Sequence, residues 1–343
     1  MKSQIELKQA FFSEKPFVLF HNDEFEVTLF RYDSGIEAVT IKNSRGEVTL
    51  LPYMGQIIWD LAFDGISLRM KNMFKQPKPA QAVVDTYGCF AFHSGLLANG
   101  CPSPEDTHLL HGEMPCAKMD KAWIILDDCS VSLGGCVEYV QGFGHHYQAN
   151  PAVCLSAGAT KIEISMQVKN LAAAEMPLQY MCHMNYAYME NGKFYSSLPA
   201  TAFKLRESIP AHVKPTEKWL AYNADIKKLQ AVGRSLECLD QPAMYDPEIV
   251  FMADEISQYG DKARIELVSP EGHRFVTEFS TREFNYATRW ILYNEDQQVA
   301  AFVLPGTCRP EGFLAAQKAG SLIMLKPGEC RAFTVVTGLE QEE

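Results

Sequence analysis

The sequence lacks the features that mark several large classes of protein. None of its ten cysteines forms a C-x-x-C pair, and no apolar run approaches the ~18 residues typical of a transmembrane helix. Clustered lysines and arginines are also missing, and 31 basic against 42 acidic side chains give a formal net charge of −11. Nucleic acids and anionic membranes bind clustered positive charge, so neither is an expected partner. The absence of a Gly-x-Ser-x-Gly elbow argues against a serine hydrolase.

The N-terminus and the cysteines indicate a cellular compartment. The first residues, Met1 to Glu6, do not form the apolar run of a signal peptide. The cysteines are scattered along the chain, and several fall inside apparent strands. We therefore expect a reduced, cytoplasmic protein with buried thiols.

Alternation of apolar and polar residues is the dominant pattern that the sequence contains. Lys161 to Val168 is the clearest case, because every second residue from Ile162 onward is apolar and the residues between them are polar. Hairpins are predicted where two such segments flank a turn, as in residues 25–41 and 264–279. The pattern predicts an all-β protein built as a large sandwich of antiparallel sheets.

Helical signals are few and short, and no linker divides the chain. Residues 313–319 can form two helical turns that end at Gly320, in a position that favours positive φ. No low-complexity segment, fixed-period repeat or Pro/Gly/Ser linker occurs. We expect one domain over residues 1–343, in which residues 1–45 form at most a small N-terminal appendage.

Two histidine-centred segments carry the most specific chemical information. Residues 108–112 read His-Leu-Leu-His-Gly ahead of Trp123, and residues 183–186 read His-Met-Asn-Tyr at the end of a predicted strand. Imidazoles titrate near neutral pH, so they suit a protein that moves protons on an uncharged polyol bound to an apolar surface. His93, before Ser94-Gly95, is a further candidate for the lining of a pocket.

The order of several motifs resembles the aldose 1-epimerase (galactose mutarotase-like) superfamily, and in particular its less-characterised bacterial branch. The resemblance covers the chain from about residue 45 to the C-terminus. It is carried by residues 110–112 followed by Trp123, and by residues 142–147, 161–170, 180–185, 305–307 and 325–329. It implies a β supersandwich with a sugar site on a concave sheet face, in agreement with the alternation described above.

The resemblance also implies roles for individual residues. Interconversion of sugar anomers needs a base for the anomeric hydroxyl and an acid for the ring oxygen. By resemblance, His183 is the acid, and His111 orients the sugar and supports charge near the ring oxygen. Asn185 is expected to bind a sugar hydroxyl. Arg69 lies near the position of a substrate-binding arginine of the family, although a surface arginine at a strand end fits it equally well.

One departure from the family pattern concerns the base. The family glutamate precedes a proline, and alignment on Pro305 places Leu304 at that position. Leucine cannot accept a proton. Glu311, seven residues on, is the carboxylate nearest in sequence and is our candidate base, with Glu113 and Glu138 as alternatives. The protein could also bind sugars without turning them over.

Three functions therefore stay open at this point. The first is an aldose 1-epimerase-like isomerase of carbohydrate metabolism that acts on a small sugar or sugar acid and needs no cofactor. The second is a carbohydrate-binding protein without catalysis. The third is a metal-dependent keto-sugar isomerase with His93, His111 and His183 as ligands. Our preferred interpretation contains no metal, and the adjacent His145 and His146 would point to opposite faces of a strand.

Overall fold

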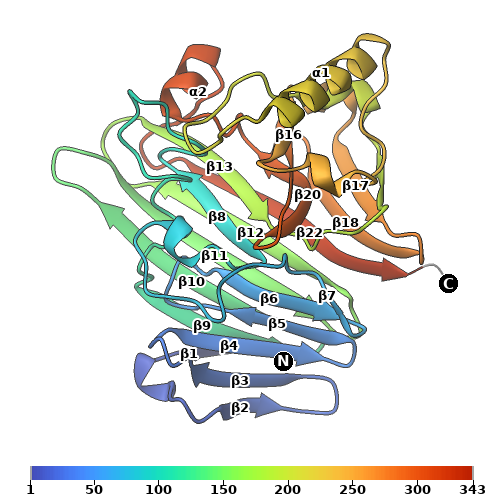
Figure 1. Cartoon of the computed structure of the whole chain (residues 1–343). Coiled ribbons are helices and arrows are strands. Elements are labelled where there is room, and N and C mark those ends of the chain that lie inside the picture. The colour runs from blue at the N-terminus through green and yellow to red at the C-terminus, as the bar shows by residue number, and fades with distance from the viewer. Residues whose placement is uncertain (1, 342–343) are drawn as a thin grey trace.

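The computed structural model describes residues 2–341, and two large antiparallel sheets dominate it (Figure 1). The nine-stranded sheet contains, in spatial order, β1 (Ser3–Glu6), β9 (Lys121–Asp127), β10 (Ser130–Val140), β11 (His146–Ser156), β12 (Lys161–Asn170), β22 (Cys330–Gln341), β18 (His273–Ser280), β17 (Lys262–Val268) and β14 (Lys193–Ser196). The thirteen-stranded sheet contains, in spatial order, β15 (Lys204–Leu205), β16 (Ile249–Ala253), β19 (Tyr286–Tyr293), β20 (Gln298–Gly306), β13 (Met176–Met184), β8 (Ala91–Leu96), β6 (Ile58–Phe63), β5 (Gly46–Leu50), β4 (Glu37–Asn43), β3 (Glu26–Arg31) and β2 (Phe17–His21), with β21 (Ile323–Leu325) beside β13 and β7 (Ile66–Ser67) beside β6.

Helices are minor elements of this architecture. The α-helices are α1 (Glu217–Ala231) and α2 (Phe313–Ala319), and short 3-10 turns are η1 (Gln9–Phe11), η2 (Val83–Thr86), η3 (Ala200–Ala202), η4 (Pro242–Met244) and η5 (Ile256–Tyr259). Within residues 2–341, none of the helices has both the length and the apolar character needed to cross a bilayer.

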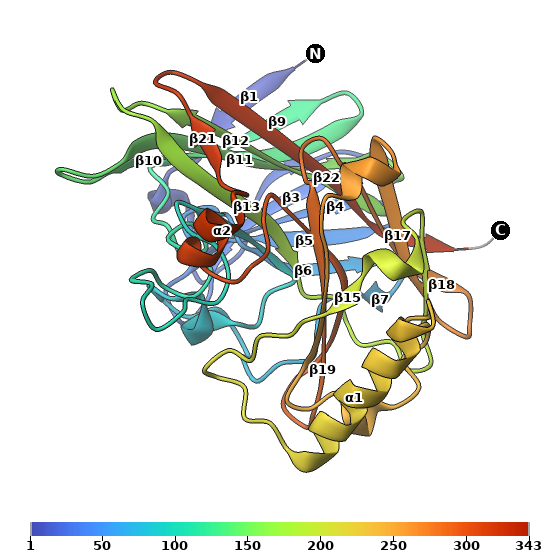
Figure 2. The same cartoon turned by 90° about the horizontal axis from the view of Figure 1, so that it is seen from above.

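The two sheets stack face to face, with the main hydrophobic core between them (Figure 2). Strand β12 shows why the sequence folds this way, because its apolar residues from Ile162 to Val168 are buried in the core and the polar residues between them are not buried. The predicted hairpins are present as β3–β4 and β17–β18. The predicted all-β sandwich is therefore confirmed.

The N-terminal residues continue both sheets. Strand β1 pairs with β9 at the edge of one sheet, and β2, β3 and β4 extend the other. Val27, Leu29 and Ile41 are fully buried and belong to the main core. This placement favours one domain without a separate N-terminal appendage.

Helix α1 is the largest element that the sequence pattern did not predict. Its N-terminus is capped by Thr216, whose hydroxyl accepts a hydrogen bond from the backbone N–H of Trp219. Trp219, Tyr222 and Ile226 are buried at helical spacing, but the polar Asn223 interrupts this apolar stripe. The helix that the sequence did predict, residues 313–319, is confirmed as α2, and Gly320 ends it with φ of 67°.

Candidate functional site

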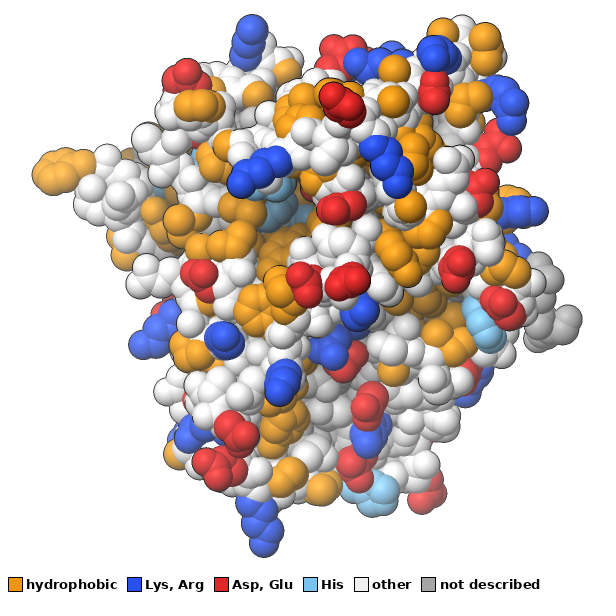
Figure 3. Space-filling model, in the orientation of Figure 1, with side chains coloured by type: hydrophobic (Ala, Val, Ile, Leu, Met, Phe, Trp, Pro, Cys, Tyr) orange, Lys and Arg blue, Asp and Glu red, His pale blue; other side chains and the backbone are white. Residues whose placement is uncertain are grey.

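A cavity of about 500 Å³ lies on the thirteen-stranded sheet. Its floor comes from four neighbouring strands, β13, β20, β19 and β16, and loops from residues 73–87, 101–111 and 206–213 contribute to its walls. Figure 3 shows a hollow on this face with histidine at its base, surrounded by hydrophobic side chains and rimmed by charged ones. The cavity is large enough for a small ligand.

The register of the strands brings the two singled-out histidines to this floor. Met181 of β13 lies opposite Gly306 of β20, so the antiparallel pairing places His183 opposite Leu304. His111 enters from the loop above, and the ring centroids of His111 and His183 are 4.7 Å apart. The structure therefore brings both imidazoles into one cavity, as the site hypothesis requires.

Alternation along the strands takes His93 away from this cavity. His93 lies opposite Cys182 of β13, whereas Phe92 lies opposite His183. Neighbouring residues of a strand face opposite sides of the sheet, so His93 points into the core, where its Nδ1 lies 2.8 Å from the hydroxyl of Tyr180. The structure does not support a role for His93 in the lining of the pocket.

A strained turn holds His111 in place. His111 has φ of 64° and Gly112 has φ of 81°, and a Cβ on Gly112 would lie 2.2 Å from the carbonyl oxygen of Ala98. Ser94 donates a hydrogen bond to Asn99 Oδ1 at 2.5 Å, and the same hydroxyl oxygen lies 3.0 Å from His111 Nδ1. Because the Ser94 proton is directed to Asn99, Nδ1 of His111 is the donor to Ser94, and its Nε2 is left as a hydrogen-bond acceptor.

The imidazoles of His111 and His183 are neutral at neutral pH. Burial lowers the pKa of His111 to about 3, and burial together with the nearby His111 holds the pKa of His183 well below its ordinary value. The resemblance implied a protonated acid at His183. In the free protein, this side chain is instead a neutral imidazole, which can still polarise an oxygen by donating its N–H.

Aromatic rings surround His183 and form apolar walls. Phe92 stacks on it with ring centroids 4.5 Å apart, and Trp290 lies 5.9 Å away in an edge-on arrangement. The Tyr87 hydroxyl lies 3.3 Å from His183 Nε2, whereas Nδ1 has no hydrogen-bond partner in the described part of the structure. Tyr87 and Trp290 both line the cavity and provide faces on which the apolar side of a sugar ring can stack.

Glu248, which we did not predict, is the only carboxylate that lines this cavity among residues 2–341. It immediately precedes β16, and its side chain is held by three neighbours. Arg206 Nη2 donates to Oε1 at 2.5 Å, the Trp290 indole donates to Oε2 at 2.7 Å, and His212 Nε2 lies 3.7 Å from Oε1. Trp290 therefore links the carboxylate to the aromatic group around His183.

The balance of forces keeps Glu248 ionised. Burial alone would raise the pKa of this carboxyl, but the His212 hydrogen bond and the Arg206 charge outweigh it, and its pKa is lowered. The cavity thus combines the ionised Glu248, paired with Arg206, with the neutral imidazoles of His111 and His183. A carboxylate of this kind can accept a proton from a ligand hydroxyl, although the lowered pKa makes it a weak base.

Glu311, the candidate base from sequence, does not line this cavity. Its carboxylate accepts a hydrogen bond from the Ser208 hydroxyl and lies 3.7 Å from Arg309 Nη1, in a neighbouring hollow. Of the alternatives, Glu113 is engaged by the backbone N–H groups of Leu96 and Leu97 at 2.9 Å each. These contacts leave Glu248 as the carboxylate beside the histidines.

The remaining sequence candidates also lie outside the cavity lining. Glu138 forms a surface contact with His146 Nε2 at 2.7 Å. Arg69 Nη2 lies 3.5 Å from Asp60 Oδ2, and Arg206 is the arginine that enters the cavity instead. Asn185 is fully buried behind Tyr87, where its amide donates to the carbonyl oxygen of Cys89 at 3.1 Å. Its Oδ1 lies 3.5 Å from the Tyr87 hydroxyl, so Asn185 contacts a residue of the cavity wall without lining the cavity itself.

The geometry does not favour the metal-dependent alternative. His93 faces the core, so it cannot join His111 and His183 around one ion. Across residues 2–341, no group of three or more His, Cys, Asp or Glu side chains is arranged to hold a metal.

Burial of neutral histidines predicts an acid-sensitive fold. Burial lowers the pKa of His93 to about 4. Above pH ~6.5 His93 is unprotonated in both the folded and the unfolded state. Between pH ~6.5 and about 4 it is protonated in the unfolded state only, so the free energy of unfolding decreases as the pH falls through this range. We expect this residue to account for about 3 kcal/mol of the free energy of unfolding lost between pH 7.5 and 4. Urea unfolding of His93→Gln should show that much less acid destabilisation, whereas the exposed control His21→Gln should behave as the wild type. Equal acid sensitivity of all three proteins would contradict the argument.

Comparison with known proteins supports the fold. No protein-family model and no curated protein matches the sequence. Among solved structures, a protein described as a "putative aldose 1-epimerase" from Klebsiella pneumoniae superposes with a TM-score of 0.77 at 14% identity, covering 99% of this chain and 88% of that one. A galactose mutarotase-like protein from Clostridium acetobutylicum superposes with a TM-score of 0.63 at 15% identity, covering 94% and 100%. The chain therefore has the galactose mutarotase-like fold that the sequence motifs indicated.

Proposed function

We propose that this protein binds a free sugar in the histidine cavity and interconverts its anomers by proton transfer. The observation that carries the proposal is the pairing, in one cavity, of the ionised Glu248 with the imidazoles of His111 and His183. The stacking faces of Tyr87 and Trp290 suit a pyranose ring, and the fold is shared with structures described as a "putative aldose 1-epimerase" and a "galactose mutarotase-like protein". A small sugar or sugar acid is accordingly the proposed ligand.

The chemistry follows from the charge states of these groups. Glu248 takes the proton of the anomeric hydroxyl as the bond between the anomeric carbon and the ring oxygen breaks, which leaves an aldehyde and an alkoxide. The N–H of His183 donates a hydrogen bond to that alkoxide, while Nε2 of His111 accepts one from a neighbouring hydroxyl. After the aldehyde rotates, the alkoxide attacks its other face and Glu248 returns the proton. The cycle needs no net proton from a neutral imidazole.

Two observations favour binding without turnover as the second candidate. Leu304 lines the cavity opposite His183, where the family resemblance places a glutamate. Both oxygens of Glu248 are already engaged, and its pKa is lowered, which reduces its strength as a base. The cavity would then recognise a sugar through the same stacking and hydrogen bonds.

Two measurements on the same protein separate these candidates. Titration calorimetry with glucose, galactose, xylose and glucuronate reports binding, and NMR exchange spectroscopy of the anomeric protons reports interconversion. We expect at least one sugar to bind and its anomers to exchange faster than in buffer. Binding without accelerated exchange would support the second candidate, and the absence of both would overturn the sugar assignment.

A further inference from the structure

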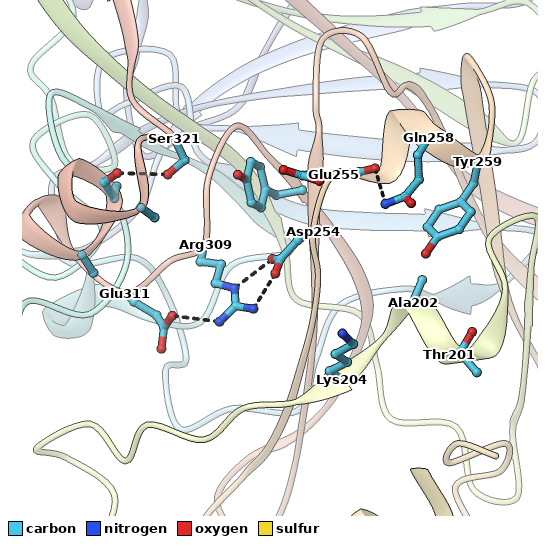
Figure 4. Close-up of a pocket in the computed structure, with 14 residues that line it drawn as sticks. Thr201, Ala202, Lys204, Asp254, Glu255, Gln258, Tyr259, Arg309, Glu311 and Ser321 are labelled. Atoms are coloured by element: carbon cyan, nitrogen blue, oxygen red, sulfur yellow. Dashed lines mark hydrogen bonds and ion pairs between the residues drawn. The ribbon is translucent and has the colours of Figure 1, made fainter. Parts of the chain in front are cut away.

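A second hollow of about 510 Å³ lies beside the histidine cavity (Figure 4). Figure 4 shows Arg309, Lys204 and Tyr259 facing the same space. Lys204 comes from β15, Tyr259 from η5 and Arg309 from the segment that follows β20. The alanine-rich face of α2 forms one wall. None of its lining residues belongs to the proton-transfer site described above.

The two hollows are adjacent along the same strands. On β19, Tyr286 lines the second hollow, and Thr288 and Trp290 line the histidine cavity. Residues at spacing two share one face of a strand, so both hollows open on the same face of the sheet. The distance along β19 from Tyr286 to Trp290 is about 13 Å, which is longer than one sugar ring.

Other segments pass from one hollow to the other in the same way. Lys204 lines the second hollow, and Arg206, two residues on, lines the histidine cavity. The segment after β20 contributes Pro310 to the cavity and Glu311 to the second hollow. Burial, and after it the charges of Glu248 and Glu311, raise the pKa of Cys101 in the cavity wall to about 11.

The lining of the second hollow is polar, and three of its charged side chains, Arg309, Asp254 and Glu311, are paired with one another. Arg309 binds the Asp254 carboxylate through Nε at 2.8 Å and through Nη2, and its Nη1 lies 3.7 Å from Glu311 Oε2. These neighbours raise the pKa of Arg309. An ionic ligand would have to compete with these pairs, whereas a neutral ligand can hydrogen-bond to their outer edges.

Neutral hydrogen-bonding groups and tyrosine rings complete the surface. Gln258 offers an amide, and Tyr259, which is 43% exposed, and Tyr286 offer ring faces with a hydroxyl at one end. Ring stacking combined with amide, hydroxyl and carboxylate groups suits a compact, uncharged polyol ring. The chemistry of the second hollow therefore matches that of one sugar unit.

We propose that the second hollow is a sugar subsite, and that the two hollows bind successive units of one oligosaccharide whose reducing end occupies the histidine cavity. The inference rests on the proposed function, which it narrows from free monosaccharides to disaccharides or longer chains. Ser208, whose hydroxyl donates to Glu311, ties the loop that carries Arg206 to the segment that lines the second hollow. This hydrogen bond therefore connects the loop of the histidine cavity to the wall of the second hollow.

The test compares sugars of different length on the intact protein. Titration calorimetry with glucose and galactose, and with maltose, cellobiose and lactose, measures the gain in affinity from a second unit. We expect at least one disaccharide to bind about tenfold more tightly than its reducing-end monosaccharide. Tyr259→Ala, a change at an exposed side chain outside the histidine cavity, should remove that gain and leave the affinity for glucose and galactose unchanged.

The outcomes distinguish this inference from the proposed function. Monosaccharide binding with no gain from any disaccharide would overturn the subsite and leave the proposed function intact. A disaccharide gain that survives in both Tyr259→Ala and Gln258→Ala would also overturn it, because the second unit would then lie elsewhere. Failure of every sugar to bind would overturn the proposed function and the subsite with it.

Discussion

Glu248→Gln should lower the rate of anomer exchange by about 10²–10⁴-fold, the contribution expected of a positioned general base. The amide oxygen can still accept the Trp290 indole N–H, but the side chain can no longer take up a proton. Affinity for the sugar should change much less than the rate, since binding depends mainly on stacking and on hydrogen bonds to other groups. NMR exchange spectroscopy and titration calorimetry on the same sample measure the two effects separately.

Glu311→Gln is the matched control for this change. It makes the same substitution at the carboxylate that the sequence favoured, in the neighbouring hollow, and should leave the monosaccharide rate near that of the wild type. Loss of Glu248 also leaves Arg206 without its carboxylate partner, so thermal unfolding must accompany the rate measurement. A folded, sugar-binding Glu248→Gln protein with an unchanged rate would exclude Glu248 as the base.

The fold was predictable because its signals are local and repeated. The alternation in β12 and in the two predicted hairpins depends only on which face of a strand is buried. Helix α1 escaped prediction because Asn223 occupies a buried position in its apolar stripe and Leu220 is exposed. At this helix the contacts with the rest of the protein, more than the sequence pattern, decide the structure.

The candidate site was predictable only in part, because strand register brings together residues that lie far apart in the sequence. His111 and His183 could be singled out from their motifs, and both line one cavity. Glu248 could not be found by counting along the chain from Leu304. It lies directly before β16, and β19 separates β16 from β20 in the sheet. The local signal for it is a charged residue directly before the apolar run of residues 249–253. Its place beside the histidines depends on sheet order, which the sequence alone does not display.

His183→Ala should lower kcat by about 10²–10³-fold with a smaller change in KM, as expected when a hydrogen-bond donor to a developing oxyanion is lost. The ring oxygen carries substantial negative charge only as the sugar ring opens, so the N–H of His183 stabilises the transition state more than the bound sugar. Since burial keeps this imidazole neutral, the rate should show no loss between pH 6 and 8 of the kind that follows deprotonation of an ordinary histidine. Progress curves of anomer exchange over a range of sugar concentrations give kcat and KM separately.

Two further variants separate chemistry from packing at this position. His183 stacks on Phe92, so alanine also removes a buried ring, whereas His183→Gln keeps an N–H donor and much of the volume. The His183→Gln variant should therefore recover part of the kcat that His183→Ala loses. If the role of His183 is purely structural, the recovery of activity should parallel the recovery of thermal stability, and KM should change as well. His93→Gln, on the opposite face of the same sheet, should leave kcat unchanged. If His183→Ala exchanges anomers at the wild-type rate, the oxygen is stabilised by another donor, and Tyr87, 3.3 Å from His183 Nε2, is the group that lies closest to take that role.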